Sequence, residues 1–283
     1  MTHETSKRRS IASTLLLSAV GLMAILSATP AAASDLSPAE QCDAAAGSEH
    51  DLQRNTAFKP VATEDMQLGV ALSACREAYK YARTPRITFQ LARALHEAGQ
   101  TQEAMTLLKE ASEEGHAVAM VNYGVHLGER GDTAGEFVLH QRAAAAGNIL
   151  AAYNLGVAYR DGVGTEVNGT LAAEWFARAS MAKDNVATFN LAVLYDDGKL
   201  VPEDNAKAAQ LYKLAAERGN VDAMVNLGIM LENGEGVAKD LTSALTIYKQ
   251  AADLGDVFAA DKASLLQPVD IGGNEASKTP DAG

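Results

Sequence analysis

The sequence predicts an all-α fold, a right-handed α-solenoid of stacked helix–turn–helix repeats. A short phrase built on asparagine returns at a fixed step of 36 residues, at Asn154, Asn190 and Asn226. The same step separates two sets of small residues: Gly162, Gly198 and Gly234, and Ala172, Ala208 and Ala244. Self-similarity at this period is typical of stacked supersecondary units, which bury their apolar faces against one another.

Five repeat units and one capping helix are expected. Asn122 and Gln90 precede Asn154 at a shorter step of 32 residues, so the repeat extends backwards. The expected units are 85–116, 117–148, 149–184, 185–220 and 221–256, followed by a capping helix over 257–266. Each unit has two apolar-periodic stretches of about a dozen residues, which is the length of a helix rather than a strand.

Helix ends are marked inside each of the last three units. The stretch Asp161-Gly162-Val163-Gly164 follows a first helix, where glycine supplies the left-handed conformation that ends it. Asn168, Asp204 and Asp240 stand where the second helices should begin, and such side chains cap helix starts. The first two units drop four residues here and should have tight turns.

These motifs resemble the Sel-1-like repeat, a member of the tetratricopeptide superfamily. The resemblance rests on Asn-Leu-Gly, a tyrosine, Asp-Gly-x-Gly, a capping aspartate, an aromatic pair, Ala-Ala and Gly-Asn. It covers residues 85–266 and is strongest in the last three units, while the first two look more like plain tetratricopeptide units. Two positions depart from the pattern: Lys183 replaces a closing glycine, and Leu200 replaces the second loop glycine.

The resemblance implies a non-enzymatic interaction scaffold or regulatory adaptor of the bacterial envelope. Proteins of this kind mostly act as adaptors, and the concave solenoid face would grip a peptide or partner protein. The alternative is an enzyme acting on cell-wall or β-lactam substrates, as described for a cysteine-rich branch; that branch carries a cysteine pair in each repeat, and these repeats have none. A eukaryotic secretory-pathway adaptor would use the sequon Asn168-Gly169-Thr170, but the export signal looks bacterial.

The first 33 residues are expected to be a signal peptide. A basic start at Lys7-Arg8-Arg9 precedes an apolar stretch, Ile11 to Leu26, and the small residues Ala31-Ala32-Ala33 suit a cleavage site. The alternative is a retained anchor, although the stretch is short for a span of about 20 residues. We therefore expect a periplasmic or secreted protein with no stable membrane span after cleavage.

The charge balance bears on the partner. The 283-residue chain has a net charge of −12, and removal of residues 1–33 leaves 21 basic and 35 acidic residues, or −14. Nucleic acid and anionic membranes repel such a surface, so no nucleic-acid partner is expected. Two explanations of the acidity remain: a protein or peptide partner, or solubility alone.

The two cysteines, Cys42 and Cys75, both precede the repeats, and in an exported protein an even count suggests a disulfide. Ser37-Pro38-Ala39-Glu40 predicts the start of a short helix carrying Cys42, and Cys75 lies in a longer apolar-periodic run. We expect residues 34–84 to form a helical cap stapled by this bond; two separate buried thiols are the alternative. The composition of 267–283 predicts a disordered tail.

No catalytic, metal or cofactor residues are predicted. The chain has neither a Gly-x-Ser-x-Gly elbow nor a phosphate loop ending in Gly-Lys-Ser or Gly-Lys-Thr. The six histidines lack metal-ligand spacing. His116, His126 and His140 could converge in space, but solvated or satisfied surface histidines are the expectation.

The candidate protein-binding residues are Asn122, Asn154, Asn190 and Asn226. In peptide-binding tetratricopeptide arrays that resemble this chain, the same position points into the groove. An amide there can donate to and accept from a peptide backbone. The alternative is that each asparagine hydrogen-bonds the neighbouring repeat and holds the stack together.

Overall fold

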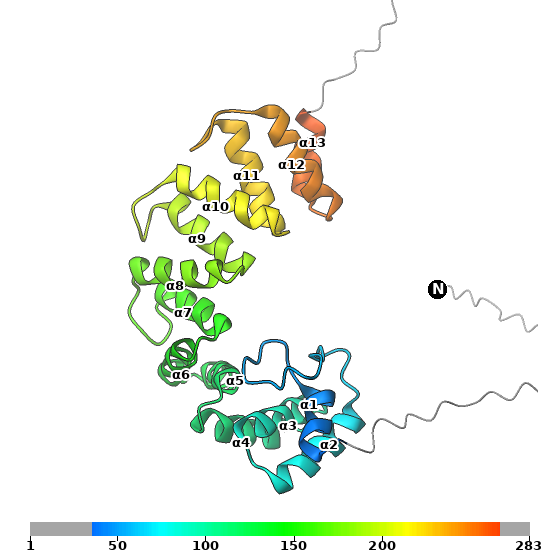
Figure 1. The fold of residues 1–283 in the computed structure, drawn as a ribbon. Helices are drawn as coiled ribbons and strands as arrows, with labels where there is room; N and C mark the ends of the chain where they lie inside the picture. The colour runs from blue at the N-terminus through cyan, green and yellow to red at the C-terminus, as the bar shows by residue number, and fades with distance from the viewer. Residues whose placement is uncertain (1–35, 267–283) are drawn as a thin grey trace, which may run out of the picture. The chain divides into compact units, whose positions relative to one another are not determined.

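In the computed structural model, residues 36–266 are described, and they form thirteen α-helices and no strands (Figure 1). The predicted signal peptide, 1–33, and the predicted tail, 267–283, lie outside these residues. The first two helices precede the repeats: α1 (Pro38–Ala46) and α2 (Leu68–Tyr81). The remaining helices are α3 (Pro85–Glu97), α4 (Thr101–Glu113), α5 (Ala117–Glu129), α6 (Thr133–Ala145), α7 (Ile149–Asp161), α8 (Gly169–Met181), α9 (Asn185–Asp197), α10 (Asn205–Glu217), α11 (Val221–Asn233), α12 (Leu241–Asp253) and α13 (Val257–Leu266).

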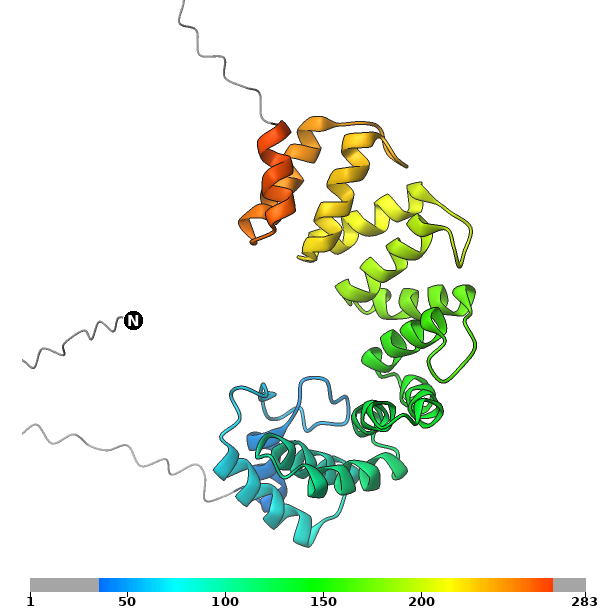
Figure 2. The ribbon, with the colours of Figure 1, turned by 180° about the vertical axis from the view of Figure 1, so that it is seen from behind.

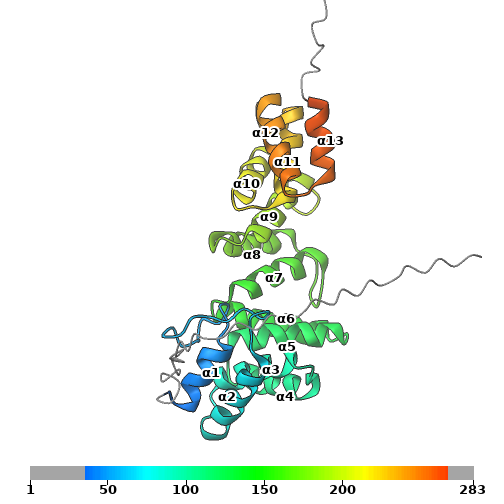
Figure 3. The same cartoon turned by 90° about the vertical axis from the view of Figure 1, so that its right-hand side faces the viewer.

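The helices from α3 onward form helix–turn–helix pairs that stack in chain order. Each helix packs on the one before and the one after it, as in α3 with α4, and α4 with α5. Figure 3 shows the C-terminal end of the stack, where α13 packs on α12. The observed architecture confirms the predicted all-α repeat fold. None of the described helices is long and apolar enough to cross a membrane.

Side-chain caps fix where the helices of the last three pairs begin. Asn168, Asp204 and Asp240 each accept a hydrogen bond from the backbone N–H of the third residue onward, at 3.0, 2.9 and 3.0 Å. The caps satisfy N–H groups that have no partner within the helix, which confirms the predicted starts. The long connections from α7 to α8, α9 to α10 and α11 to α12 lie on the same side of the stack (Figure 2).

The first departure from the repeat pattern keeps the shape of its turn. Lys183 has φ of 70°, the only positive φ of a residue other than glycine among the described residues. Glycine occupies the matching turns at Gly147 and Gly219. Lys183 therefore bears the steric cost of a left-handed conformation that glycine avoids.

The second departure is compensated by the neighbouring repeat. The loop glycines Gly164 and Gly236 lie against the backbone of Thr133 and Asn205, the first residues of α6 and α10, where a Cβ would overlap. In the unit between them the loop residue is Leu200, and the first residue of the facing helix, Gly169, is the glycine. At this contact the glycine is on the helix instead of the loop, so the two backbones can still approach closely.

Each second helix carries a buried residue at the same position, its eighth. These residues are Leu108, His140, Phe176, Tyr212 and Tyr248, all below 5% exposed. Phe176 and Tyr248 lie against Gly156 and Gly228 of their own first helices, where an added Cβ would overlap the rings. Glycine at this point therefore sets how closely the two helices of a unit can pack.

Candidate protein-binding surface

One face of the first helices carries four recurring positions, which we call the first-helix face. They are the second, sixth, ninth and thirteenth residues, whose spacing of four, three and four puts them on one side of a helix. The sixth position holds Gln90, Asn122, Asn154, Asn190, Asn226 and, in the capping helix, Lys262. The ninth holds Arg93, Val125, Val157, Val193, Ile229 and Leu265, and the thirteenth holds Glu97, Glu129, Asp161, Asp197 and Asn233.

Three of the four predicted asparagines contact the preceding repeat. Asn154 Nδ2 lies 3.2 Å from Nε2 of His140, and Asn190 Oδ1 accepts a 2.6 Å hydrogen bond from Arg160. Asn226 interacts with the Tyr212 hydroxyl, whose pKa is raised chiefly by burial and is lowered in part by this hydrogen bond. All three are half-buried. These contacts fit the alternative in which the asparagines hold the stack together, and a binding role for the same residues stays a prediction.

Asn122 differs from the other three. Its side chain is exposed and makes no side-chain hydrogen bond within residues 36–266. It lines a groove of about 540 Å³ together with Asn154. Of the predicted residues, Asn122 is therefore the one whose amide has its full hydrogen-bonding capacity available.

The groove is formed by the loop 47–66 and by α3, α4, α5 and α7. Its polar lining includes Ser48, His50, Thr63, Arg93, His96, Glu97, Asn122, His126, Glu129 and Asn154. Its apolar lining includes Phe89, Met105, Val118, Val121, Val125 and Leu150. Concave surfaces with an apolar floor and a few directed polar groups are typical of binding sites.

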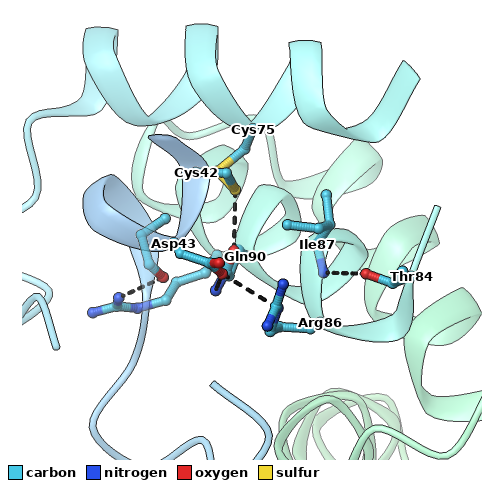
Figure 4. The surroundings of a disulfide bond; sticks show 9 residues. Cys42, Asp43, Cys75, Thr84, Arg86, Ile87 and Gln90 are labelled. Atoms are coloured by element: carbon cyan, nitrogen blue, oxygen red, sulfur yellow. Dashed lines mark hydrogen bonds and ion pairs between the residues drawn. A yellow bond between two sulfur atoms is a disulfide. The ribbon is translucent and has the colours of Figure 1, made fainter. Parts of the chain in front are cut away.

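The chain's own N-terminal segment occupies the first-helix face of the first unit. Nε of Arg86 lies 3.2 Å from Oδ1 of Asp43, and Gln90 Nε2 donates to the same oxygen at 3.0 Å (Figure 4). Arg86 is the second residue and Gln90 the sixth residue of α3. Two of the four positions thus hold an acidic side chain of the cap.

Arg93, at the ninth position, holds the loop 47–66 by its backbone. Its guanidinium donates to the carbonyl oxygens of Ala46 at 3.2 Å and Val61 at 2.7 Å, and to Oγ1 of Thr63 at 3.1 Å. Burial lowers the pKa of Arg93, yet a guanidinium keeps its charge in proteins. Backbone carbonyls therefore serve as ligands for this face.

A disulfide anchors the segment that reaches this face. Cys42 of α1 and Cys75 of α2 are both fully buried and are joined, with an S–S distance of 2.00 Å. Ser37 and Glu40 form the expected capping box at the start of α1. Figure 4 shows the bond above the contacts of Asp43 and Gln90.

A buried histidine–aspartate pair ties the loop to the start of α5. Nδ1 of His116 accepts from the Ala119 N–H at 3.2 Å, so the ring proton belongs on Nε2, which lies 3.3 Å from Oδ1 of Asp51. The His116 ring stacks on Phe89, with centroids 4.5 Å apart. The loop is thus fixed at Arg93 and at His116.

The expectation of surface histidines is wrong for His116 and His140, which are 0% and 2% exposed. Burial lowers the pKa of His140. The repeat register could have revealed His140, since it stands 36 residues before the buried Phe176. The partner of His116 carried no such signal, because Asp51 lies in a loop without periodicity. His126 lines the groove instead, with His50 and His96.

Across residues 36–266, no cluster of three or more histidine, cysteine, aspartate or glutamate side chains could hold a metal ion. The polar groups of the groove are arranged to donate and accept hydrogen bonds along a surface. Such an arrangement suits binding to a polypeptide.

The stacked helix pairs and this face define a helical-repeat protein. Residues 149–184, 185–220 and 221–256 each match the Sel1 repeat, so this part of the chain consists of three Sel1 repeats. No curated protein sequence matches it.

Two solved structures with similar folds come from bacteria. A Sel1 repeat protein from Oxalobacter formigenes is 25% identical, with a TM-score of 0.61, and the match covers 73% of this chain and 86% of that one. A protective antigen of uropathogenic Escherichia coli strains with an SLR fold is 24% identical, with a TM-score of 0.66. That match covers 71% of this chain and 45% of the antigen, so this chain spans less than half of the antigen's length.

Proposed function

We propose that this chain is an exported scaffold or regulatory adaptor of the bacterial envelope, which binds a peptide or partner protein on its first-helix face. Sel1-like and tetratricopeptide-like repeats usually mediate protein–protein interaction, and such scaffold families are generally non-enzymatic. The residues of this face that would meet a partner are Asn122 and Asn154, with Asn190 and Asn226 further along the stack.

One observation carries the proposal: the first-helix face already binds a polypeptide segment in the first unit. Arg86 and Gln90 hold Asp43, and Arg93 holds the backbone carbonyls of Ala46 and Val61. The next unit presents the corresponding positions to the groove, where Asn122 has no partner among the described residues. A partner segment placed there would continue the same type of contact.

Export is supported by the basic, apolar and small-residue order of residues 1–33 and by the disulfide. Disulfides persist in oxidising compartments such as the bacterial periplasm. The expected mature chain starts at Ser34. N-terminal sequencing of protein from the extracytoplasmic fraction would contradict this if residues 1–33 were intact.

The binding proposal is tested by crosslinking and affinity capture from the native compartment, with Asn122→Ala compared with the unaltered chain. Because Asn122 makes no stabilising side-chain hydrogen bond in the described region, its loss should leave the melting temperature unchanged and lower recovery of a stoichiometric protein several-fold. Asn154→Ala should lower both, since it also removes the contact to His140.

The matched control is Gln102→Ala, an exposed amide on α4 outside the groove. It should leave both recovery and melting temperature unchanged. Equal recovery by the Asn122→Ala variant and the unaltered chain would place binding elsewhere. Recovery of no stoichiometric protein by any form would count against a scaffold.

A further inference from the structure

We infer that the groove takes an extended peptide segment that alternates apolar and basic side chains. The inference rests on the proposed function, because it names the partner chemistry for the same face. It follows from the exposed groups of the groove and from how the chain fills the first-helix face itself.

The groove has an exposed apolar surface on which apolar side chains of the partner can pack. Val125 and Leu150 line the groove and are 41% and 44% exposed. They lie at the ninth position of α5 and the second position of α7, next to the amides of Asn122 and Asn154 on the same face. This combination suits a strand-like segment. Its apolar side chains would pack on Val125 and Leu150, and its backbone N–H and C=O groups would hydrogen-bond the amides.

The carbonyl groups already bound at the first-helix face favour a partner that is not helical. The loop 47–66 has no helix, and it lines one side of the groove through Ser48, His50 and Thr63. Arg93 binds the backbone carbonyl of Val61 in this loop and that of Ala46, the last residue of α1, where the helix has ended. A helical partner would have its carbonyls occupied by its own hydrogen bonds.

Charge favours a basic partner over an acidic one. The thirteenth position brings the carboxylates Glu97 and Glu129 to the groove, and the Glu129 side chain is 70% exposed. The guanidinium that lines the groove, Arg93, is already engaged by three oxygen atoms, which belong to Ala46, Val61 and Thr63. The net charge of −12 would also attract a basic segment at long range.

The contact between Arg86 and Asp43 shows that an acidic partner would need a cationic side chain at the second position. The first helices that line the rest of the groove lack one. Asp43 is held by Arg86 at the second position of α3. The same position holds Val118 in α5 and Leu150 in α7. A partner carboxylate beside these residues would lose water without gaining a cation, which is costly.

The experiment uses the full mature chain, immobilised, and two pools of short peptides with capped ends. Both pools alternate apolar residues with charged ones, which are lysine and arginine in one pool and aspartate and glutamate in the other. Retention at neutral pH is compared for the unaltered chain, Glu97→Gln with Glu129→Gln, and Asn122→Ala. Melting temperatures confirm that each variant is folded.

The matched control is Glu166→Gln with Glu174→Gln, which changes the net charge equally at two exposed residues outside the groove. We expect the basic pool to be retained preferentially, with a several-fold loss in the Glu97/Glu129 variant and in Asn122→Ala, and with little change in the control. An equal loss in the control would mean non-specific attraction and would overturn the inference.

The other outcomes separate the inference from the function on which it rests. Preferential retention of the acidic pool that depends on Asn122 would overturn the basic partner while leaving peptide binding at this face intact. Retention of either pool that no groove variant changes would overturn both. The absence of retention of either pool would also overturn the inference.

Discussion

Tyr248 of α12 donates a hydrogen bond to Oε2 of Glu232 on α11, at 3.0 Å. The same relationship occurs one repeat earlier, where Tyr212 donates to Asp196 at 3.0 Å. In the third repeat the aromatic residue is Phe176, which has no hydroxyl, and the acidic position is Arg160, which instead binds Asn190. The repeat thus fixes a place for a polar side chain on the first helix of each unit, and the partner of that side chain varies from one unit to the next.

Removing the hydroxyl should weaken the C-terminal end of the stack. Tyr248→Phe is expected to lower the free energy of unfolding by about 1 kcal/mol, the usual net value of such a hydrogen bond. Glu232 would keep its contact with Lys262 of α13, at 2.9 Å, so α13 should remain docked. Denaturant unfolding measures the change.

The control for this substitution is Tyr195→Phe. Tyr195 accepts its hydrogen bond from Lys207 at a more exposed site, so its loss should cost less. Equal destabilisation by the two substitutions would contradict the role assigned to the buried contact.

The stability of the fold should decrease in mild acid because of His140. Burial holds the pKa of His140 below its usual value, so the unfolded chain takes up a proton at a higher pH than the folded chain does. Its contribution is fully present above the unfolded pKa of about 6.5 and is lost as the pH falls through the folded pKa.

His140→Phe places the residue of the next repeat at this position and should flatten that part of the pH profile. Chemical denaturation between neutral and mildly acidic pH gives the comparison. His50→Gln is the control, because His50 is exposed, and it should leave the slope unchanged. An unaltered slope in the His140→Phe variant would show that other groups cause the acid sensitivity.

The compensated loop contact predicts an asymmetric response to adding one methyl group. Gly169→Ala would drive a Cβ into the carbonyl group of Leu200 and should destabilise the fold by about 1–3 kcal/mol. Gly69→Ala adds the same group near the start of α2, where no atom lies within 4 Å. It should be neutral or slightly stabilising, because alanine favours the helix. Thermal unfolding of both variants tests the contrast, which equal effects would refute.

Loss of the disulfide should loosen the cap rather than the whole chain. Cys42→Ala with Cys75→Ala opens a bond between residues 33 apart, worth about 3–4 kcal/mol on the chain-entropy estimate. Repeat stacks transmit stability mainly between neighbours, so the three Sel1 repeats should stay folded.

Hydrogen exchange resolves where the effect of this double substitution falls. Faster exchange in residues 36–84, with little change in 149–256, is expected. The same acceleration over both segments would show that the cap stabilises the entire stack. Intact-mass measurement of the unaltered protein from an oxidising compartment must show no free thiols if the bond forms there.

Helix positions could be predicted from the sequence because their determinants are local. Asn168, Asp204 and Asp240 cap the N–H groups three residues onward, and the glycines that follow the first helices need only their own backbone freedom. The fixed step of 36 residues then carried each assignment from one unit to the next. The three repeats were predictable for this reason.

The partners of the polar side chains were not predictable in the same way. Asn154 and Asn190 occupy the same place in successive repeats, yet one contacts His140 and the other Arg160. The partner depends on which residue of the preceding repeat lies nearby. The position of a residue within its repeat does not predict which atoms it contacts. The sequence therefore did not decide whether the asparagines hold the stack together or bind a ligand.

The sequence by itself determined the helices, the repeat register and the cysteine pair of this protein, because spacing, capping and composition act over short stretches of chain. Only the tertiary structure decided that Asp51 meets His116, that Arg93 binds the loop 47–66, and that Gly169 makes room for Leu200. These contacts join segments 31 to 65 residues apart, and Asp51 and the loop belong to no periodic pattern. Their geometry arises when the helices pack, and it is this packing that leaves Asn122 open in the groove.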